Sequence, residues 1–123
     1  MGRLSGKRIV LTGSSRSLGR RFALACAAEG ASLVINGTNA EALATVAEEI
    51  AALGTPVHAV CGSVAETPAC NALVDTCVKQ YGGIDVLVNN AGIVRDRTLL
   101  KMSDADFDEV IAVNLRGPFL CTR

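Results

Sequence analysis

Short apolar runs alternate with amphipathic helical patterns along this chain, and the alternation limits the folds that it can adopt. The runs lie at residues 7–12, 32–36, 57–60 and 85–89. Near-continuous apolar strands are typical of parallel sheets that are buried on both faces. The sequence therefore predicts a doubly wound parallel α/β sheet with helices on both faces and the strand order 3-2-1-4. In such a sheet, ligands bind outside the carboxyl ends of the first and fourth strands.

Capping residues and glycines predict where the helices begin and end. We expect N-caps at Thr38, where Glu41 completes a capping box, at Thr67 and at Ser103. Gly30 is expected to end the first helix, because glycine readily takes the left-handed conformation. The positions at helical spacing are Leu18, Phe22, Ala25, Cys26 and Glu29 in the first helix; Leu43, Val46, Ile50 and Leu53 in the second; Leu73, Val74, Cys77, Val78 and Tyr81, predicted to be buried, in the third; and Phe107, Ile111 and Leu115 in the last.

Composition and charge favour one close-packed domain and exclude several kinds of partner. The 123 residues are 50% hydrophobic and 3% aromatic, which fits an α/β core of small side chains. Twelve basic and twelve acidic residues cancel, so no nucleic-acid partner is expected. No segment approaches the roughly 20 apolar residues of a membrane span. The five cysteines have no metal-like spacing and are interpreted as small core side chains of a cytoplasmic protein; the alternative is a redox or metal role.

The turn between the first strand and the first helix, residues 12–19, has the composition of a phosphate-binding loop. Gly13 permits a tight exit from the strand, and Gly19 permits close packing of the helix on the sheet. Unpaired N–H groups and the helix dipole favour a pyrophosphate at this helix N-terminus. The nucleotide-binding residues predicted in this turn are Gly13, Ser14, Ser15, Arg16, Ser17, Leu18 and Gly19.

Two motifs of the chain resemble the short-chain dehydrogenase/reductase family. The turn is similar to the family's T-G-x-x-x-G-x-G motif, except that Ser17 stands in place of the middle glycine. The fourth strand ends in Asn89-Asn90-Ala91-Gly92, which is the family's N-N-A-G motif. The resemblance implies a Rossmann-type domain with Asn90, Ala91 and Gly92 beside a coenzyme. Ser17 would either crowd the coenzyme phosphates or donate a hydrogen bond to them.

The end of the second strand favours NADP(H) over NAD(H). NAD enzymes place a carboxylate there, whereas Asn36 and Thr38 carry no charge that would repel a 2′-phosphate. NADP-preferring relatives often have a basic residue in the turn, where Arg16 stands; the alternative is that Arg16 is a solvated surface charge. Ser63 replaces the aspartate with which the family binds adenine. We therefore place Asn36, Thr38, Ser63 and the Val64 backbone at the nucleotide.

A third segment, residues 114–117, is similar to the family's N-x-x-G sequence. The resemblance gives Asn114 the catalytic role of holding a water in a proton relay; the alternative is a polar side chain that bonds back to its own helix. Pro118 predicts a kink close by. The stretch Ile93–Arg97 is most similar to the family's 3-oxoacyl-[acyl carrier protein] reductase group, which implies a carbonyl or alcohol substrate such as a 3-oxoacyl thioester.

The resemblance extends over the chain yet reaches only about half of the family fold. Family members transfer hydride with a serine and a Tyr-x-x-x-Lys pair, whereas Tyr81 is the only tyrosine here and Asp85 follows it at that spacing. We therefore expect a sheet cut short inside the helix that ends at Arg123, no activity from residues 1–123 alone, and a homo-oligomer in the complete protein. Three interpretations stay open: an oxidoreductase that continues beyond Arg123, an inactive nucleotide-binding module, or a subunit completed by a partner chain.

Overall fold

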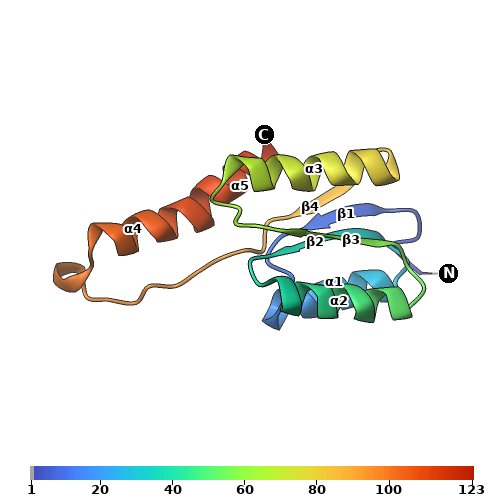
Figure 1. Cartoon of the computed structure of the whole chain (residues 1–123), viewed down its shortest axis with the longest axis horizontal. Coiled ribbons are helices and arrows are strands. Elements are labelled where there is room, and N and C mark those ends of the chain that lie inside the picture. The colour runs from blue at the N-terminus through green and yellow to red at the C-terminus, as the bar shows by residue number, and fades with distance from the viewer. Residues whose placement is uncertain (1) are drawn as a thin grey trace.

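The computed structural model describes residues 2–123 and contains a four-stranded parallel sheet between helices (Figure 1). The strands are β1 (Arg8–Leu11), β2 (Ser32–Gly37), β3 (Val57–Cys61) and β4 (Val86–Val88). They pair in the order β3-β2-β1-β4, and each pairing is parallel. The Rossmann-type order 3-2-1-4 is thus confirmed, and every strand boundary lies within one residue of its predicted place.

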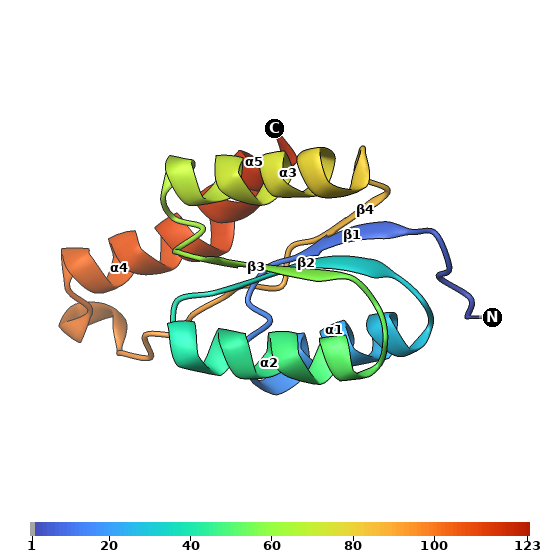
Figure 2. The same cartoon turned by 45° about the vertical axis from the view of Figure 1, so that its right-hand side comes forward.

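Helices cover both faces of the sheet (Figures 1 and 2). The helices α1 (Ser17–Ala28) and α2 (Ala40–Ala52) lie on one face, and α3 (Thr67–Tyr81) and α5 (Gly117–Thr122) lie on the other. Successive strand side chains point to opposite faces, so each strand contributes to two cores. The α1/α2 core contains Ile9, Leu11, Leu33 and Ile35, and the α3/α5 core contains Val10 and Val34.

Helix α1 packs on the sheet through its smallest residues. It ends just before Gly30, as predicted, and Gly30 has the left-handed φ of 92°. The predicted helix is therefore confirmed, but its large apolar side chains do not form the buried face: Leu18 and Phe22 are 62% and 42% exposed. The residues that α1 buries are Gly19, Ala23 and Ala27. Small side chains bring the helix axis close to the strands, and this closeness shapes the turn after β1.

Two of the predicted N-caps are wrong by one residue. The side chain of Asn39, not of Thr38, caps α2 and accepts a hydrogen bond from the backbone N–H of Ala42 at 3.0 Å. Asparagine is one of the strongest N-cap residues, so it outcompetes the threonine before it. The N-cap of α3 is Glu66, which makes no side-chain cap, and Thr67 is the first helical residue. Both errors lie within the usual uncertainty of a helix boundary.

Helix α3 holds two of the cysteines in the core. Cys70 and Cys77 are buried on the same face as Leu73, as predicted from their spacing. Val78 is 49% exposed, contrary to prediction, because it lies one residue, or about 100°, beyond that stripe. Cys61, at the end of β3, is exposed rather than buried. All five cysteines are free thiols.

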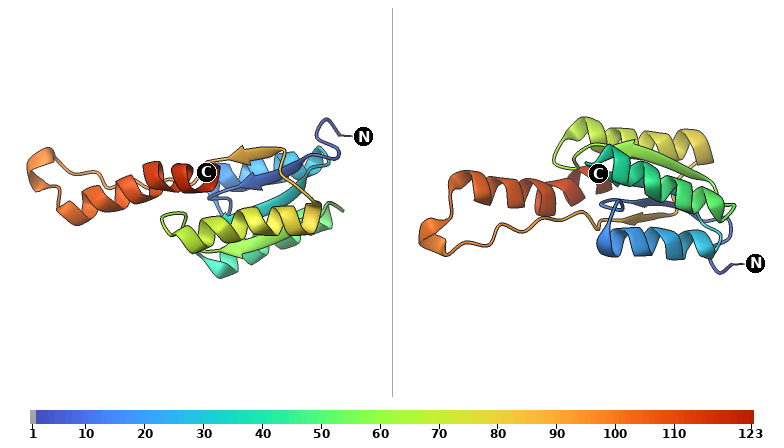
Figure 3. Two further views of the ribbon diagram at one scale, coloured as in Figure 1. Left: turned by 90° about the horizontal axis from the view of Figure 1, so that it is seen from above. Right: turned by 60° about the horizontal axis from the view of Figure 1, so that its bottom comes forward.

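Beyond β4 the chain leaves the sheet and returns through a bent helical segment (Figures 1 and 3). After the 3-10 helix η1 (Leu99–Lys101), Ser103 begins α4 (Asp104–Ile111) as the predicted N-cap, in a capping box with Asp106. A π-helical turn, η2 (Ala112–Arg116), joins α4 to α5. Pro118 has no N–H to donate to the carbonyl of Asn114, four residues earlier, and this missing bond accounts for the predicted irregularity.

Neither a membrane-spanning helix nor a metal-ligand cluster occurs among residues 2–123. No helix there combines the length and the apolar character needed to cross a membrane. No group of three or more His, Cys, Asp or Glu side chains in those residues could hold a metal ion. Every buried side-chain nitrogen or oxygen in the same part of the chain has a hydrogen-bond partner.

An ion pair joins Arg8, the first residue of β1, to Asp85, the residue before β4. The Arg8 guanidinium donates from Nε to Asp85 Oδ2 at 2.9 Å and from an Nη to Oδ1 at 3.0 Å, and the Arg8 backbone N–H donates to Oδ2 at 2.8 Å. These bonds hold the pKa of Asp85 well below its usual range, the side-chain bond from Arg8 being the main cause. The pair aligns two strands that are distant in sequence.

We expect Asp85→Asn to lower the stability of the protein at pH 7 and to flatten the acid side of its stability profile. The folded-state pKa of Asp85 is depressed, so its contribution is present above the unfolded pKa of about 3.9 and is lost as the pH falls below it. Urea unfolding at pH 7 and pH 3 measures the change. Asp75→Asn, on the exposed surface of α3, is the control. Equal acid sensitivity of Asp85→Asn and the unmodified protein would exclude this role.

Candidate functional site

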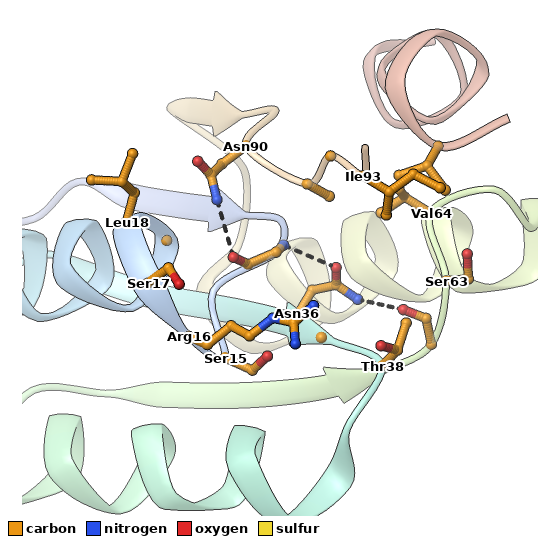
Figure 4. A pocket seen from close by; sticks show the side chains of 17 residues that line it. Ser15, Arg16, Ser17, Leu18, Asn36, Thr38, Ser63, Val64, Asn90 and Ile93 are labelled. Atoms are coloured by element: carbon orange, nitrogen blue, oxygen red, sulfur yellow. Dashed lines mark hydrogen bonds between the residues drawn. The ribbon is translucent and has the colours of Figure 1, made fainter. Parts of the chain in front are cut away.

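A cavity of about 330 Å³ lies at the carboxyl ends of the strands (Figure 4). The turn after β1 lines this cavity, together with the ends of β2 and β3 and the segments that follow β2, β3 and β4. Every predicted nucleotide-binding residue except Ser14 lines it. Those residues are Gly13, Ser15, Arg16, Ser17, Leu18, Gly19, Asn36, Thr38, Ser63, Val64, Asn90, Ala91 and Gly92. Sequence reasoning missed four further lining residues: Gly37, Gly62, Ile93 and Val113.

The side chain of Asn36 ties three strand ends together. It is 2% exposed, and its Oδ1 accepts a hydrogen bond from the Gly13 backbone N–H at 3.2 Å. Its Nδ2 donates to the carbonyls of Val60 at 3.1 Å and Gly62 at 2.9 Å (Figure 4). Both amide hydrogens are therefore committed to the protein. Asn36 borders the cavity but serves as a brace between β2, β3 and the turn after β1.

Ser14 also turns inward rather than toward the cavity. It is fully buried, and its hydroxyl donates to the Leu11 carbonyl at 2.9 Å and accepts from the Asn36 backbone N–H at 3.0 Å. The Ser14 side chain thus holds the turn against β2. Its contribution to the site is the shape of the backbone, since its hydroxyl has no access to the cavity.

Thr12 and Asn90 join the turn after β1 to the segment after β4. The Thr12 hydroxyl oxygen accepts hydrogen bonds from the backbone N–H groups of Asn90 and Ala91, both at 3.0 Å. The Asn90 side chain donates to the Gly13 carbonyl at 3.0 Å (Figure 4). The two glycine-containing motifs are therefore held as one rigid cavity wall, which explains why threonine and asparagine accompany the glycines.

The N-terminus of α1 opens toward the cavity. Its N-cap, Arg16, makes no side-chain cap, and the first turn carries no acidic residue. The first helical bond there is from the Arg20 N–H to the Arg16 carbonyl, so the N–H groups before Arg20 have no helical acceptor. Free N–H groups at the positive end of a helix dipole form a binding site for an anion. The arrangement therefore favours a phosphorylated ligand.

Ser17 occupies a backbone conformation that suits glycine. With φ of 50°, it is the single non-glycine residue with positive φ among residues 2–123. It stands where the family motif has its middle glycine. The left-handed region costs an L-residue about 1–2 kcal/mol. The departure from the motif therefore strains the backbone of the turn at Ser17.

We expect Ser17→Gly to stabilise the protein by about 0.5–1 kcal/mol, because glycine relieves the left-handed strain but loses more entropy on folding. The free energy of unfolding in urea measures the gain. Ser15→Gly, in the same turn but without positive φ, gives the control and should lower the stability. A loss of stability in Ser17→Gly would show that the serine hydroxyl outweighs the strain.

The Asn114 side chain braces the segment after β4. Its Oδ1 accepts from the Ile93 backbone N–H and its Nδ2 donates to the Ile93 carbonyl, both at 2.9 Å. Asn114 itself does not line the cavity, whereas Ile93 and Val113 do. The side chain thus bonds to a neighbouring segment and not back to its own helix. It acts on the cavity by positioning Ile93.

Tyr81 lies at the opposite end of the sheet from the cavity. Its hydroxyl donates to the Leu33 carbonyl at 2.9 Å, and its ring lies 5.6 Å from that of His58. Burial raises the pKa of Tyr81 to about 12. The tyrosine is therefore a neutral structural donor between α3 and β2.

Comparison with known proteins relates this chain to one family. The sequence profile of the short chain dehydrogenases matches residues 7–123. The chain is 43% identical over 117 residues to the 3-oxoacyl-[acyl-carrier-protein] reductase FabG of Staphylococcus aureus, covering 94% of this chain and 47% of the reductase. It is 46% identical over 126 residues to the hydroxyacyl-CoA dehydrogenase ChsB1 of Mycobacterium tuberculosis, covering 98% and 39%.

Solved structures agree with these relatives. A short chain dehydrogenase from Burkholderia cenocepacia, crystallised in complex with NADP, superposes with a TM-score of 0.94 at 37% identity. The match covers 98% of this chain and 50% of that structure. The chain therefore spans half or less of the length of the proteins that it matches.

Proposed function

This chain belongs to the short-chain dehydrogenase/reductase family, and from that premise we propose that it forms the NADP(H)-binding half of an oxidoreductase. The main support for this proposal is the cavity wall. There, hydrogen bonds of Thr12 and Asn90 join the turn after β1, which leads into the open N-terminus of α1, to the segment after β4. Bound coenzyme would supply or accept a hydride at a carbonyl or hydroxyl carbon. Residues 1–123 would act as one coenzyme-binding domain.

Each part of the cavity wall suits a different part of the dinucleotide. The open N–H groups of α1 and the glycines at 13 and 19 would hold the pyrophosphate. Ser63 and the Val64 backbone would contact the adenine, and residues 90–92 would lie beside the nicotinamide ribose. Asn114 would act by positioning Ile93 against the coenzyme. The backbone carbonyl of Asn114 receives no hydrogen bond from Pro118, which has no N–H, and would accept one from the water of a proton relay.

The charges around the cavity support NADP(H) over NAD(H). No acidic residue lines the cavity within residues 2–123, so nothing there repels a 2′-phosphate. Arg16 lines it, is exposed, and takes part in none of the ion pairs in the described part of the chain. A guanidinium without a protein partner is free to make charge-assisted bonds to phosphate.

Calorimetric titration with NADPH and NADH tests this proposal. We expect NADPH to bind more tightly and Arg16→Ala to weaken NADPH binding roughly tenfold or more, the effect of losing a charge-assisted hydrogen bond, while NADH binding changes little. Arg21→Ala, on the exposed surface of the same helix, is the control. Equal affinity for the two coenzymes, or an Arg16→Ala variant that loses neither, contradicts the assignment.

The substrate proposal rests on the names of the relatives. One reduces a 3-oxoacyl group on an acyl carrier protein, and another is a hydroxyacyl-CoA dehydrogenase. Both names describe acyl thioesters with an oxygen function on the acyl chain. We therefore propose a small-molecule substrate of this class, interconverted between carbonyl and alcohol.

Exposed apolar side chains support an assembly in the complete protein. They gather on η1, α4, η2 and α5, on the segment that extends from the sheet (Figure 3). The largest are Leu99, Leu100, Phe107, Leu115 and Phe119, each more than half exposed. Apolar patches of this kind mark protein interfaces. We therefore propose that the complete protein is a homo-oligomer. We also propose that it is cytoplasmic, because the five free thiols fit a reducing compartment.

A further inference from the structure

Val64 forms part of the cavity wall although it is almost fully buried. It lines the cavity in the segment after β3, yet it is only 4% exposed. Its side chain belongs to the apolar core on the α3/α5 side of the sheet, in one cluster with Cys70 and Cys121. Neither α3 nor α5 lines the cavity. The position of this wall is therefore set by the packing behind it.

Gly117, the first residue of α5, lies directly against Val64. It is buried, and a Cβ added to it would lie 2.7 Å from Val64 Cγ2 and 3.3 Å from the Val64 carbonyl oxygen. Its φ of −56° is helical, so other L-residues could adopt this backbone. The contact therefore requires glycine for space and not for conformation. A methyl group at position 117 would push Val64 toward the cavity or move α5 away from it.

The thiol of Cys70 holds the same residue through its backbone. Cys70 lies in the first turn of α3, is 1% exposed, and donates from Sγ to the Val64 carbonyl at 3.1 Å. A thiol is a weak donor, but a buried carbonyl that is left without a partner costs free energy. Val64 is thus fixed at its side chain by Gly117 and at its carbonyl by Cys70.

The helical segment that carries Gly117 also fixes a second part of the cavity wall. Three residues earlier, Asn114 makes two hydrogen bonds to Ile93, in the segment after β4. Figure 4 shows Val64 and Ile93 at the same end of the cavity. Their relative positions are therefore set by one helical turn, with Asn114 at one contact and Gly117 at the other.

We propose that Gly117 and Cys70 are positioning residues of the coenzyme site, although neither lines the cavity. Gly117 gives the Val64 side chain its place in the wall, and the Cys70 thiol holds the Val64 carbonyl in the core. The inference rests on the proposed coenzyme-binding function and adds to it a layer of residues behind the wall. A change at either position reaches bound coenzyme through Val64.

A double-variant cycle, titrated with NADPH by calorimetry, tests the role of Gly117. Gly117→Ala should weaken NADPH binding roughly tenfold or more, because its methyl group displaces Val64. Val64→Ala should weaken binding only severalfold, since it keeps the backbone in place. In the double variant the added methyl group no longer meets Val64 Cγ2, so the affinity should return to nearly that of Val64→Ala. Arg116→Ala, at the exposed position before Gly117, is the control and should bind NADPH normally.

Three variants on α3 test the role of Cys70. Cys70→Ala removes the donor and should weaken NADPH binding severalfold, whereas Cys70→Ser keeps a donor and should retain most of the affinity. Cys77→Ala is the matched control, because the Cys77 thiol is also buried and bonds a carbonyl, that of Gly83 at 3.3 Å, near the other end of the helix. It should lower the stability in urea without changing NADPH binding. An equal loss of NADPH affinity in Cys77→Ala and Cys70→Ala would show that Cys70 only supports the fold.

The outcomes separate this inference from the proposed function. Failure of the unmodified protein to bind NADPH would overturn both. Normal NADPH binding by Gly117→Ala, or a double variant whose loss is the product of the two single losses, would overturn the role of Gly117 alone. Urea unfolding of the same variants measures the steric coupling without coenzyme. Should Gly117→Ala be unfolded, the double variant is expected to fold and to bind NADPH, and its failure to do so would contradict the coupling.

Discussion

Gly19→Ala should lower the free energy of unfolding by about 3 kcal/mol and weaken NADPH binding by more than tenfold. A Cβ at position 19 would overlap the carbonyl oxygen of Gly13 and lie 2.6 Å from Asn90 Nδ2. Both atoms belong to the hydrogen bond that joins the turn after β1 to the segment after β4. Forcing a methyl group into this contact costs roughly 1–3 kcal/mol, and loss of the bond adds about 1 kcal/mol.

Helix propensity alone would predict the opposite change in the free energy of unfolding for Gly19→Ala. Position 19 lies within α1, where alanine would otherwise be favoured over glycine by about 1 kcal/mol. Urea unfolding and calorimetric titration with NADPH measure the two effects. Gly92→Ala is the matched control for stability, since its added Cβ would meet nothing closer than 3.5 Å. If Gly19→Ala were as stable as Gly92→Ala, close helix packing would not be the reason for this glycine.

The strand order and the position of the cavity follow from features that are local in the sequence. Apolar runs of strand length separated by helical patterns leave few parallel topologies, and a glycine-rich turn after the first of them locates the ligand end of the sheet. The N-N-A-G segment is likewise local in the sequence. Its four residues are contiguous and together shape the backbone after the fourth strand, so the motif can be recognised without the structure.

Contacts between distant segments could not be predicted in this way. Whether Leu18 or Ala23 faces the sheet depends on how closely α1 approaches it, and not on the apolar spacing alone. The direction of the Asn36 side chain depends on carbonyls in and after β3, and the partner of Arg8 lies 77 residues away. Polar residues near a predicted site can equally be braces or ligand contacts, and only the three-dimensional arrangement separates the two.

Asn36→Asp should be strongly destabilising at neutral pH, although it only replaces the side-chain NH2 group by an oxygen and hardly changes the volume of the side chain. The carboxylate could still accept from the Gly13 N–H but could not donate to the carbonyls of Val60 and Gly62. Two buried acceptors would then face a negative charge. Each unsatisfied buried group costs about 1–3 kcal/mol, so the expected loss is roughly 3–5 kcal/mol. Thermal or urea unfolding at pH 7.5 measures it, and Ser63→Ala, at a half-buried position of the same cavity, is the control.

The pH dependence of Asn36→Asp distinguishes the amide's role as a brace from a role in ribose binding. Burial and the facing carbonyls would raise the folded pKa of the new carboxyl above its unfolded value of about 3.9. The protonated form is then favoured by folding, so the variant should regain stability as the pH falls from 7.5 toward 5. A carboxylate that instead reached the ribose would bind NADH more tightly at pH 7.5 and would not need protonation. Because the Asn36 side chain points into the protein between β2 and β3, we expect the stability to rise in acid and the NADH affinity not to improve.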